Sequence, residues 1–136
     1  MINRRTMFKK FTALSVAAVV GMNALPVSAQ EMMITAAGTF EGRSNHETTG
    51  SVKVIEEGGR TFVELGADFS LDGGPDPHVA FGKDGVYNPD TLLGALLTLS
   101  GKQRYALPAT MSSNDFNEVY IWCEVAGVPL GVASLN

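Results

Sequence analysis

Short runs of alternating apolar and polar residues, separated by glycine-rich turns, constrain the fold of this chain more than any other feature. Two runs, Ser51 to Glu56 and Arg60 to Leu65, flank Glu57-Gly58-Gly59, where the glycines accept the positive φ of a tight turn. We therefore expect a β-hairpin there. The same two-residue period, typical of strands with one buried face, recurs in Val52 with Val54, Phe69 with Leu71, Val79 with Phe81, and Tyr105 with Leu107.

The later segments are less uniform, and one of them fits two structures. The segment Asp90 to Leu99 could form a helix with Asp90 as its N-cap, because four of its leucines have helical spacing: Leu92, Leu93, Leu96 and Leu97. Gly94 disfavours a long helix there. Ser112 to Asp115 is typical of a polar turn. A last pair of strands is expected over Glu118 to Ala126 and Val128 to Leu135. The pattern predicts an all-β fold, an antiparallel β-sandwich of about eight to ten short strands.

The first residues of the chain have the pattern of an export signal. The basic residues Arg4, Arg5, Lys9 and Lys10 precede an apolar stretch, 11–25, that is too short to span a bilayer. Val27-Ser28-Ala29 then supplies the small side chains that a signal peptidase prefers. We expect a signal peptide over residues 1–29 and a single mature domain over 30–136. That domain is expected to be periplasmic or extracellular, without a membrane anchor.

Two export routes fit this signal. The segment Arg4-Arg5-Thr6-Met7-Phe8-Lys9 resembles a twin-arginine signal, a route that carries folded proteins, often with a cofactor. An ordinary Sec signal is the alternative, because basic n-regions contain paired arginines by chance.

The mature region is acidic and has one cysteine. Of the ten basic residues, four lie in the signal, so six remain against fourteen acidic ones and give a formal charge of −8. This charge disfavours nucleic acid as a partner. With no second cysteine, Cys123 is a free thiol, a ligand or an intermolecular bridge.

A series of separate motifs covers nearly the whole mature region. In order, they are Gly38-Thr39-Phe40, His46 before Gly50-Ser51-Val52, Gly74-Pro75-Asp76-Pro77-His78-Val79, Gly101 to Pro108, Val119-Tyr120-Ile121-Trp122-Cys123, and Val128 to Ala133. They resemble the DM-thirteen family, also called the electron-transfer DM domain and often considered alongside DOMON domains. At Leu130 that family more often has an aromatic residue. The resemblance implies an all-β fold and a redox role centred on the family's signature cysteine, here Cys123.

The neighbours of Cys123 favour a different interpretation of the same residue. A strand over Glu118 to Ala126 places Cys123 on an apolar face with Val119, Ile121 and Val125. A thiolate is poorly solvated among aliphatic side chains, which makes it a slow nucleophile. A buried structural cysteine is therefore the alternative to a redox centre. Tyr120 and Trp122, on the other face, are expected to be packing residues or a partner-binding patch.

The sequence does not identify a cofactor. No Cys-x-x-Cys-His motif attaches a haem, and no second cysteine completes an iron–sulfur cluster. A non-covalent haem or a mononuclear metal stays open, and the candidate ligands are Cys123, His46, His78 and Met111. His46 lies in a polar stretch and His78 follows Pro77, so solvated positions are the alternative for both. Asp68, Asp72 and Asp76 are expected to form a turn rather than a calcium site.

Two classes of function remain. The first is an exported redox or cofactor-binding module centred on Cys123, with a redox partner or a small ligand. The second is a non-catalytic β-sandwich that binds a ligand or a protein. A conventional enzyme is disfavoured, because the chain has neither a Gly-x-Ser-x-Gly elbow nor a His-Glu-x-x-His motif.

Overall fold

The computed structural model of the chain describes residues 31–136. The expected signal peptide, 1–29, and its cleavage before Gln30 lie outside the described residues. The described region is built from antiparallel strands and two short 3-10 helices, which confirms the prediction of an all-β antiparallel fold. Within residues 31–136, no helix has the length and apolar character needed to cross a membrane.

Eleven strands are present, where about eight to ten were expected, and four of them are only two residues long. In chain order they are β1 Met32–Gly42, β2 Thr48–Thr49, β3 Ser51–Glu57, β4 Arg60–Leu65, β5 Ser70–Leu71, β6 Pro77–Lys83, β7 Val86–Tyr87, β8 Gly94–Ala95, β9 Gln103–Ala106, β10 Glu118–Cys123 and β11 Val128–Ser134. The 3-10 helices are η3 Pro89–Thr91 and η4 Ser113–Asp115.

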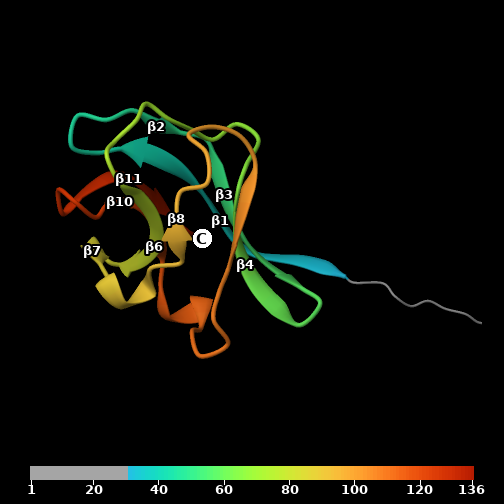
Figure 1. Cartoon of the computed structure of the whole chain (residues 1–136). Helices are drawn as coiled ribbons and strands as arrows, with labels where there is room; N and C mark the ends of the chain where they lie inside the picture. Colours follow the sequence, from blue (N-terminus) through green and yellow to red (C-terminus); the bar gives the residue numbers. More distant parts are fainter. Residues whose placement is uncertain (1–30) are drawn as a thin grey trace, which may run out of the picture. The chain divides into compact units, whose positions relative to one another are not determined.

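One long strand, β1, connects the two halves of the main sheet. The strand order is β7-β6-β10-β11-β1-β3-β4-β9, with β8 paired to β6. The first part of β1, Met32 to Thr39, pairs with β3, and its last part, Phe40 to Gly42, pairs with β11. In Figure 1, β6, β7, β10 and β11 lie on the left and β3 and β4 on the right. The sheet therefore folds over on itself around β1 and encloses a core.

The core is formed by the inward faces of both halves. The predicted hairpin is present, and Gly58 and Gly59 have φ values of 60° and 79° in its turn. The alternating pairs predicted to face inward are buried: Val52, Val54, Phe69, Leu71, Val79, Phe81, Tyr105 and Leu107. An edge-on contact between Phe40 and Phe69, with ring centroids 5.4 Å apart, joins β1 to the chain before β5.

The ambiguous segment Asp90 to Leu99 does not form an α-helix. The only helical part is η3, and its N-cap is Asn88, whose side chain accepts the N–H of Asp90 at 2.9 Å. Asp90 is thus inside the first turn rather than its cap. The chain then extends, and Gly94, with φ 146°, pairs with Val79 in the sheet. Pairing with β6 therefore overrides the helical spacing of the leucines.

The strand that contains Cys123 is shorter than expected. β10 ends at Cys123, and residues 124–127 form a turn in which Gly127 has φ 67°. Val125 lies in this turn and is 75% exposed, so the prediction that it shares the buried face of Cys123 is wrong. The turn that reverses the chain into β11 therefore ends the strand three residues before the expected Ala126.

Candidate functional site

Cys123 lies at the end of a strand, directly below a surface turn. Its side chain belongs to the core and is 1% exposed, and it shares the inward face of β10 with Val119 and Ile121. The backbone N–H of Ala126 donates a hydrogen bond to Sγ at 3.5 Å. Ala126 belongs to the exposed turn, 124–127. The sulfur is therefore buried in the core and accepts a hydrogen bond from the exposed turn that follows it.

His78 lies on the opposite side of the sheet from Cys123. It pairs with Trp122 across β6 and β10, and directly paired residues share a face. Trp122 and Cys123 are consecutive, so their side chains point to opposite faces. The imidazole stays local, with Nδ1 3.2 Å from the carbonyl oxygen of Asp76 and 3.6 Å from its carboxylate.

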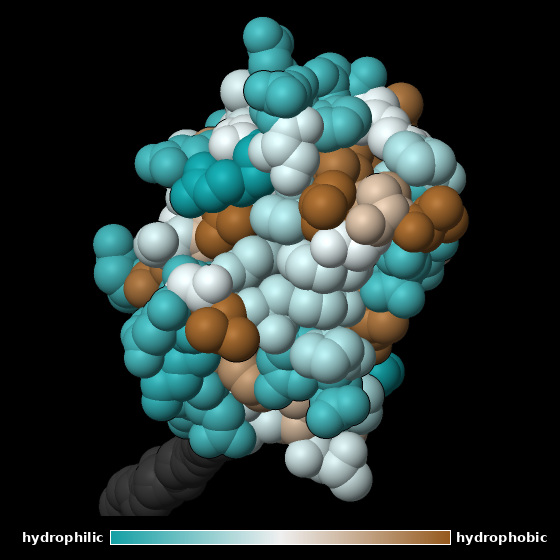
Figure 2. All heavy atoms as spheres, turned by 90° about the vertical axis from the view of Figure 1, so that its left-hand side faces the viewer, coloured by the Kyte–Doolittle hydropathy of each residue, from teal (hydrophilic) through white to brown (hydrophobic). Residues whose placement is uncertain are grey.

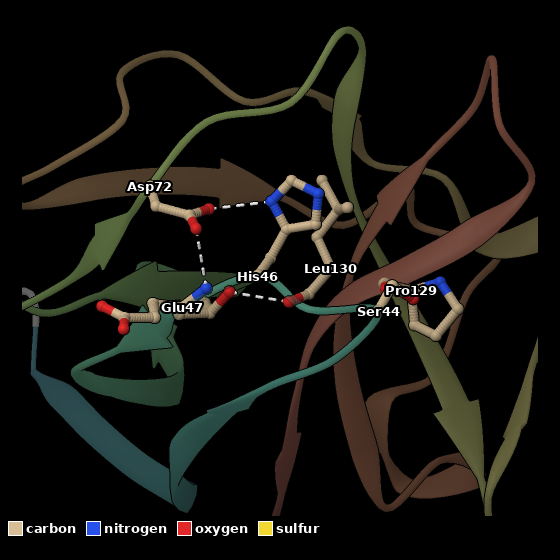
Figure 3. Close-up of polar contacts among 7 residues, drawn as sticks. Ser44, His46, Glu47, Asp72, Pro129 and Leu130 are labelled. Carbon is tan, nitrogen blue, oxygen red and sulfur yellow. Dashed lines mark hydrogen bonds and ion pairs between the residues drawn. The ribbon is translucent and has the colours of Figure 1, made fainter.

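His46 forms a hydrogen bond with Asp72 that anchors the loop between β1 and β2. Its Nδ1 lies 2.8 Å from Oδ1 of Asp72, while Oδ2 of Asp72 accepts the backbone N–H of Glu47 at 3.0 Å (Figure 3). These bonds, from Glu47 first and then His46, hold the pKa of Asp72 below its usual value. Asp72 therefore acts as a local hydrogen-bond acceptor that joins two loops.

Two further hydrogen bonds connect the same loop to β11. The hydroxyl of Ser44 donates to the carbonyl of Pro129 at 2.6 Å, and that of Thr48 donates to the carbonyl of Leu130 at 2.8 Å. Ser44 has φ 56°, a left-handed conformation that lets the loop turn sharply. The hydrogen bonds around His46 therefore join three segments: the β1–β2 loop, the chain after β5, and β11.

Met111 lies at the other end of the molecule from Cys123. It lines a hollow with Thr61 and Leu107 near the β3–β4 turn, which is level with the start of β1. Cys123 pairs with Val128, beyond the end of β1. The structure therefore does not bring the four candidate ligands together.

The donors available also do not form another metal site. Among residues 31–136, no group of three or more His, Cys, Asp or Glu side chains is placed to hold a metal ion. Asp68, expected to lie in a turn, accepts both the N–H and the hydroxyl of Ser51, at 2.9 and 2.8 Å. In the described part of the chain, Cys123 therefore does not belong to a set of three such side chains that could hold a mononuclear metal.

A second feature lies on the outer face of the same strands, where Tyr120 and Trp122 were expected but Tyr87 was not. The rings of Tyr87 and Trp122 stack with centroids 3.7 Å apart and planes 5° apart, and Tyr120 meets both edge-on. We call these three residues the aromatic triad. They line a groove of about 510 Å³ together with Val86, Pro129 and Arg43.

This groove opens on the side of the molecule that carries β7, β10 and β11. Figure 2 shows there a band of weakly polar and apolar surface between hydrophilic margins. Tyr87 reaches the groove because the Asp84-Gly85 turn folds β7 back onto β6, where Tyr87 pairs with Gly82. An Asp-Gly dipeptide between apolar residues is a hairpin signal. This local signal indicates that Tyr87 folds back onto β6, and the pairing of β6 with β10 then places it beside Trp122.

Each tyrosine of the triad donates its hydroxyl to a carboxylate. Tyr87 donates to Glu124 and Tyr120 to Glu118, both at 3.2 Å. Burial, with a smaller contribution from Glu124, raises the pKa of Tyr87 to about 12. Burial also raises the pKa of Tyr120, and Glu118 adds to this effect. Both phenols are therefore neutral donors at ordinary pH.

The fold and the site together define a class: an all-β antiparallel module with one thiol below a surface turn. Residues 39–135 match the family model described as electron transfer DM13, and the chain belongs to the DM13 family. No curated protein and no solved structure matches the chain. The family's description supports a redox module that transfers electrons.

Proposed function

We propose that this chain is an exported electron-transfer module in which the thiol of Cys123 is the redox group. The observation that carries the proposal is the position of Sγ at the last residue of β10, below an exposed turn whose Ala126 N–H donates to it. This hydrogen bond gives the buried sulfur a polar partner on the surface side, the side from which a reactant would approach. Membership of the DM13 family supports the same assignment.

Reaction at Cys123 requires the turn 124–127 to open. The turn is exposed along its whole length. Its first residue, Glu124, bonds to Asp76 and Tyr87, whereas the N–H of Gly127 donates to the nearby carbonyl of Cys123 at 2.8 Å. Segments with few buried contacts open at a lower free-energy cost than the whole fold. Opening the turn would expose the sulfur without unfolding β10.

The chemistry available to a lone thiol involves a partner. Within residues 31–136 no second cysteine can resolve an oxidised Cys123. Oxidation therefore leads either to a sulfenate or to a mixed disulfide, in which the thiolate attacks a partner's disulfide and one partner thiolate leaves. The acidic mature region makes a protein or small-molecule partner a better match than nucleic acid.

The compartment follows from the amino-terminal sequence. The basic residues, the short apolar stretch and Val27-Ser28-Ala29 support export and a mature chain that starts at Gln30. Intact-mass analysis of the exported protein tests this. A mass that retains Met1 to Ala29 contradicts it.

The redox assignment is tested on protein purified from its native compartment. We expect oxidation with a small disulfide to add one adduct at Cys123, reversibly, and the Cys123→Ser variant to form none. Met111→Leu is the matched control, because Met111 lies far from the thiol and the change leaves every cysteine in place. An unmodified Cys123 after prolonged native incubation, in a colourless protein, contradicts the proposal.

A binding module without redox chemistry is the second candidate. It is favoured by the groove that the aromatic triad lines, because aromatic side chains are enriched where proteins bind partners. This alternative predicts that Cys123→Ser leaves binding of the ligand or protein partner intact, whereas Trp122→Ala abolishes that binding. The two variants therefore separate the two candidates.

A further inference from the structure

The aromatic triad joins two kinds of group that one-electron chemistry needs. Trp122 and Tyr87 are the side-chain types most easily oxidised by loss of one electron, and their parallel rings lie 3.7 Å apart. At this distance the two π-systems are in van der Waals contact. The groove exposes the pair to a reactant from outside.

The hydrogen bond of Tyr87 supplies the second requirement. A phenol that loses an electron becomes strongly acidic and must give up its proton, which is fast only if an acceptor is already in place. Glu124 Oε2 lies 3.2 Å from the Tyr87 hydroxyl and accepts its hydrogen bond. Glu124 belongs to the exposed turn, so a proton received there can exchange with water.

The third tyrosine of the described chain shows the contrast. Tyr105 is buried, and its hydroxyl donates to the side-chain amide oxygen of Gln103 and accepts the N–H of Leu97. An amide oxygen is a very weak base, so it does not take the proton of an oxidised phenol. Tyr105 is thus a natural control for Tyr87 within the same molecule.

We propose that Tyr87, Trp122 and Glu124 form a proton-coupled electron relay that delivers single electrons to an oxidant docked at the groove. The inference rests on the proposed electron-transfer function and deepens it, because it names the surface at which electrons leave the domain. The reactant is a one-electron oxidant, such as a transition-metal centre of a partner protein.

The step balances within the named groups. Trp122 gives one electron to the oxidant and becomes a radical cation. The O–H bond of Tyr87 then breaks, its electron restores Trp122, and its proton goes to Glu124. The products are a neutral tyrosyl radical, a protonated carboxyl and an oxidant reduced by one electron. One electron from a reduced transition-metal centre of a partner protein, together with the proton held on Glu124, converts the tyrosyl radical back to the phenol.

Flash photolysis of the full exported protein tests this relay. The probe is photo-oxidised ruthenium tris-bipyridine, a soluble one-electron oxidant, and the readouts are the transient absorption and electron paramagnetic resonance of the radical. We expect a tryptophan radical that decays into a tyrosyl radical, with a rate lowered in heavy water. Tyr87→Phe should remove the tyrosyl signal, and Tyr105→Phe should leave it unchanged.

Glu124→Gln separates a proton acceptor from a merely structural neighbour. The amide keeps the size and a hydrogen bond but not the basicity, so we expect tyrosyl formation to slow by about 100-fold, within the range for a positioned proton acceptor. An unchanged rate in Glu124→Gln, or a tyrosyl signal that survives Tyr87→Phe, overturns the relay.

The same samples distinguish this inference from the proposed function. Disulfide adduct formation at Cys123 is measured on each variant in parallel. A radical at Tyr87 beside an inert Cys123 supports the relay and contradicts the cysteine-centred function. A reactive Cys123 without a radical at Tyr87 supports that function and overturns the relay.

Discussion

The outer faces of the two half-sheets carry different kinds of side chain: paired charged groups on one half and aromatic rings on the other. On β3, β4 and β9, the Glu64 carboxylate, with a side chain only 9% exposed, lies 3.1 Å from Lys102 and 3.2 Å from Arg104. Arg104 also contacts Glu57 at 2.8 Å and lies over the ring of Phe62. The charged groups on this face are therefore paired with one another.

The outer face of β6, β10 and β11 stays open. There the large side chains are the aromatic triad, and their carboxylate partners, Glu118 and Glu124, lie at the margins. The charged half therefore has its polar groups paired with one another, whereas the aromatic half lines a groove with the rings of Tyr87, Tyr120 and Trp122. The difference indicates that the first face serves stability and the second serves interaction.

The largest loss of stability should come from adding a side chain at Gly82, which lies against Tyr120 in the aromatic half. A Cβ at Gly82 would lie 2.6 Å from the carbonyl oxygen of Val86 and closer still to Cε1 of Tyr120. We expect Gly82→Ala to lower the free energy of unfolding by about 2–3 kcal/mol, the cost of overpacking, and to distort the groove. Urea denaturation measures the loss.

A control isolates this clash from backbone strain. Gly59 has φ 79°, and a methyl group added there would have no neighbouring atom within 4 Å, so Gly59→Ala should cost only about 1 kcal/mol. Equal losses in the two variants would mean that Tyr120 and β7 adjust freely, and the groove would not be a fixed feature.

Removing the charge of Glu64 from the charged half should lower the free energy of unfolding by a smaller amount. Burial alone would raise the pKa of Glu64, but hydrogen bonds from Lys102 and Arg104 outweigh it, so the pKa lies below the usual 4.5. We expect Glu64→Gln to cost about 1 kcal/mol at neutral pH, because partly exposed ion pairs contribute modestly.

The pH dependence of this contribution has a definite sign. Since the folded pKa is lowered, the stabilisation is present in full above pH 4.5 and is lost as the pH falls through the folded value. Urea midpoints of the wild type and Glu64→Gln should therefore converge in acid. Glu56→Gln, at an exposed position on β3, is the control and should run parallel to the wild type.

The smallest effect on stability should come from Tyr87→Phe. The ring stack with Trp122 is kept, and only the exposed hydrogen bond to Glu124 is lost, so we expect a cost of about 0.5 kcal/mol. Thermal denaturation checks this value. A loss larger than that of Glu64→Gln would reverse the assignment of the two faces, because the aromatic half would then be the structural one.

Local sequence signals predicted the parts of the fold that depend on neighbours in the chain. The Glu57-Gly58-Gly59 turn and the alternating pairs specify the β3–β4 hairpin and its buried face, because turn chemistry and a two-residue period are local properties. Asp90 to Leu99 could not be assigned in this way. Its structure depends on the pairing of Gly94 with Val79, a contact with another strand.

The site was predictable only in part for the same reason. Alternation on β10 indicates correctly that Cys123 faces the core, but not that the strand ends there and exposes Val125. The pairing of His46 with Asp72 joins residues 26 positions apart, and no local pattern specifies it. The triad needs both the Asp84-Gly85 turn and the register of β6 with β10.

The most direct test of the cysteine-centred function measures how Cys123 becomes accessible. Alkylation of the native thiol is followed as urea is raised well below the unfolding transition. If the turn 124–127 opens locally, the rate should depend only weakly on urea, because little surface is exposed in that opening. A rate that rises with the full urea dependence of global unfolding would contradict this function and leave Cys123 as a structural core residue.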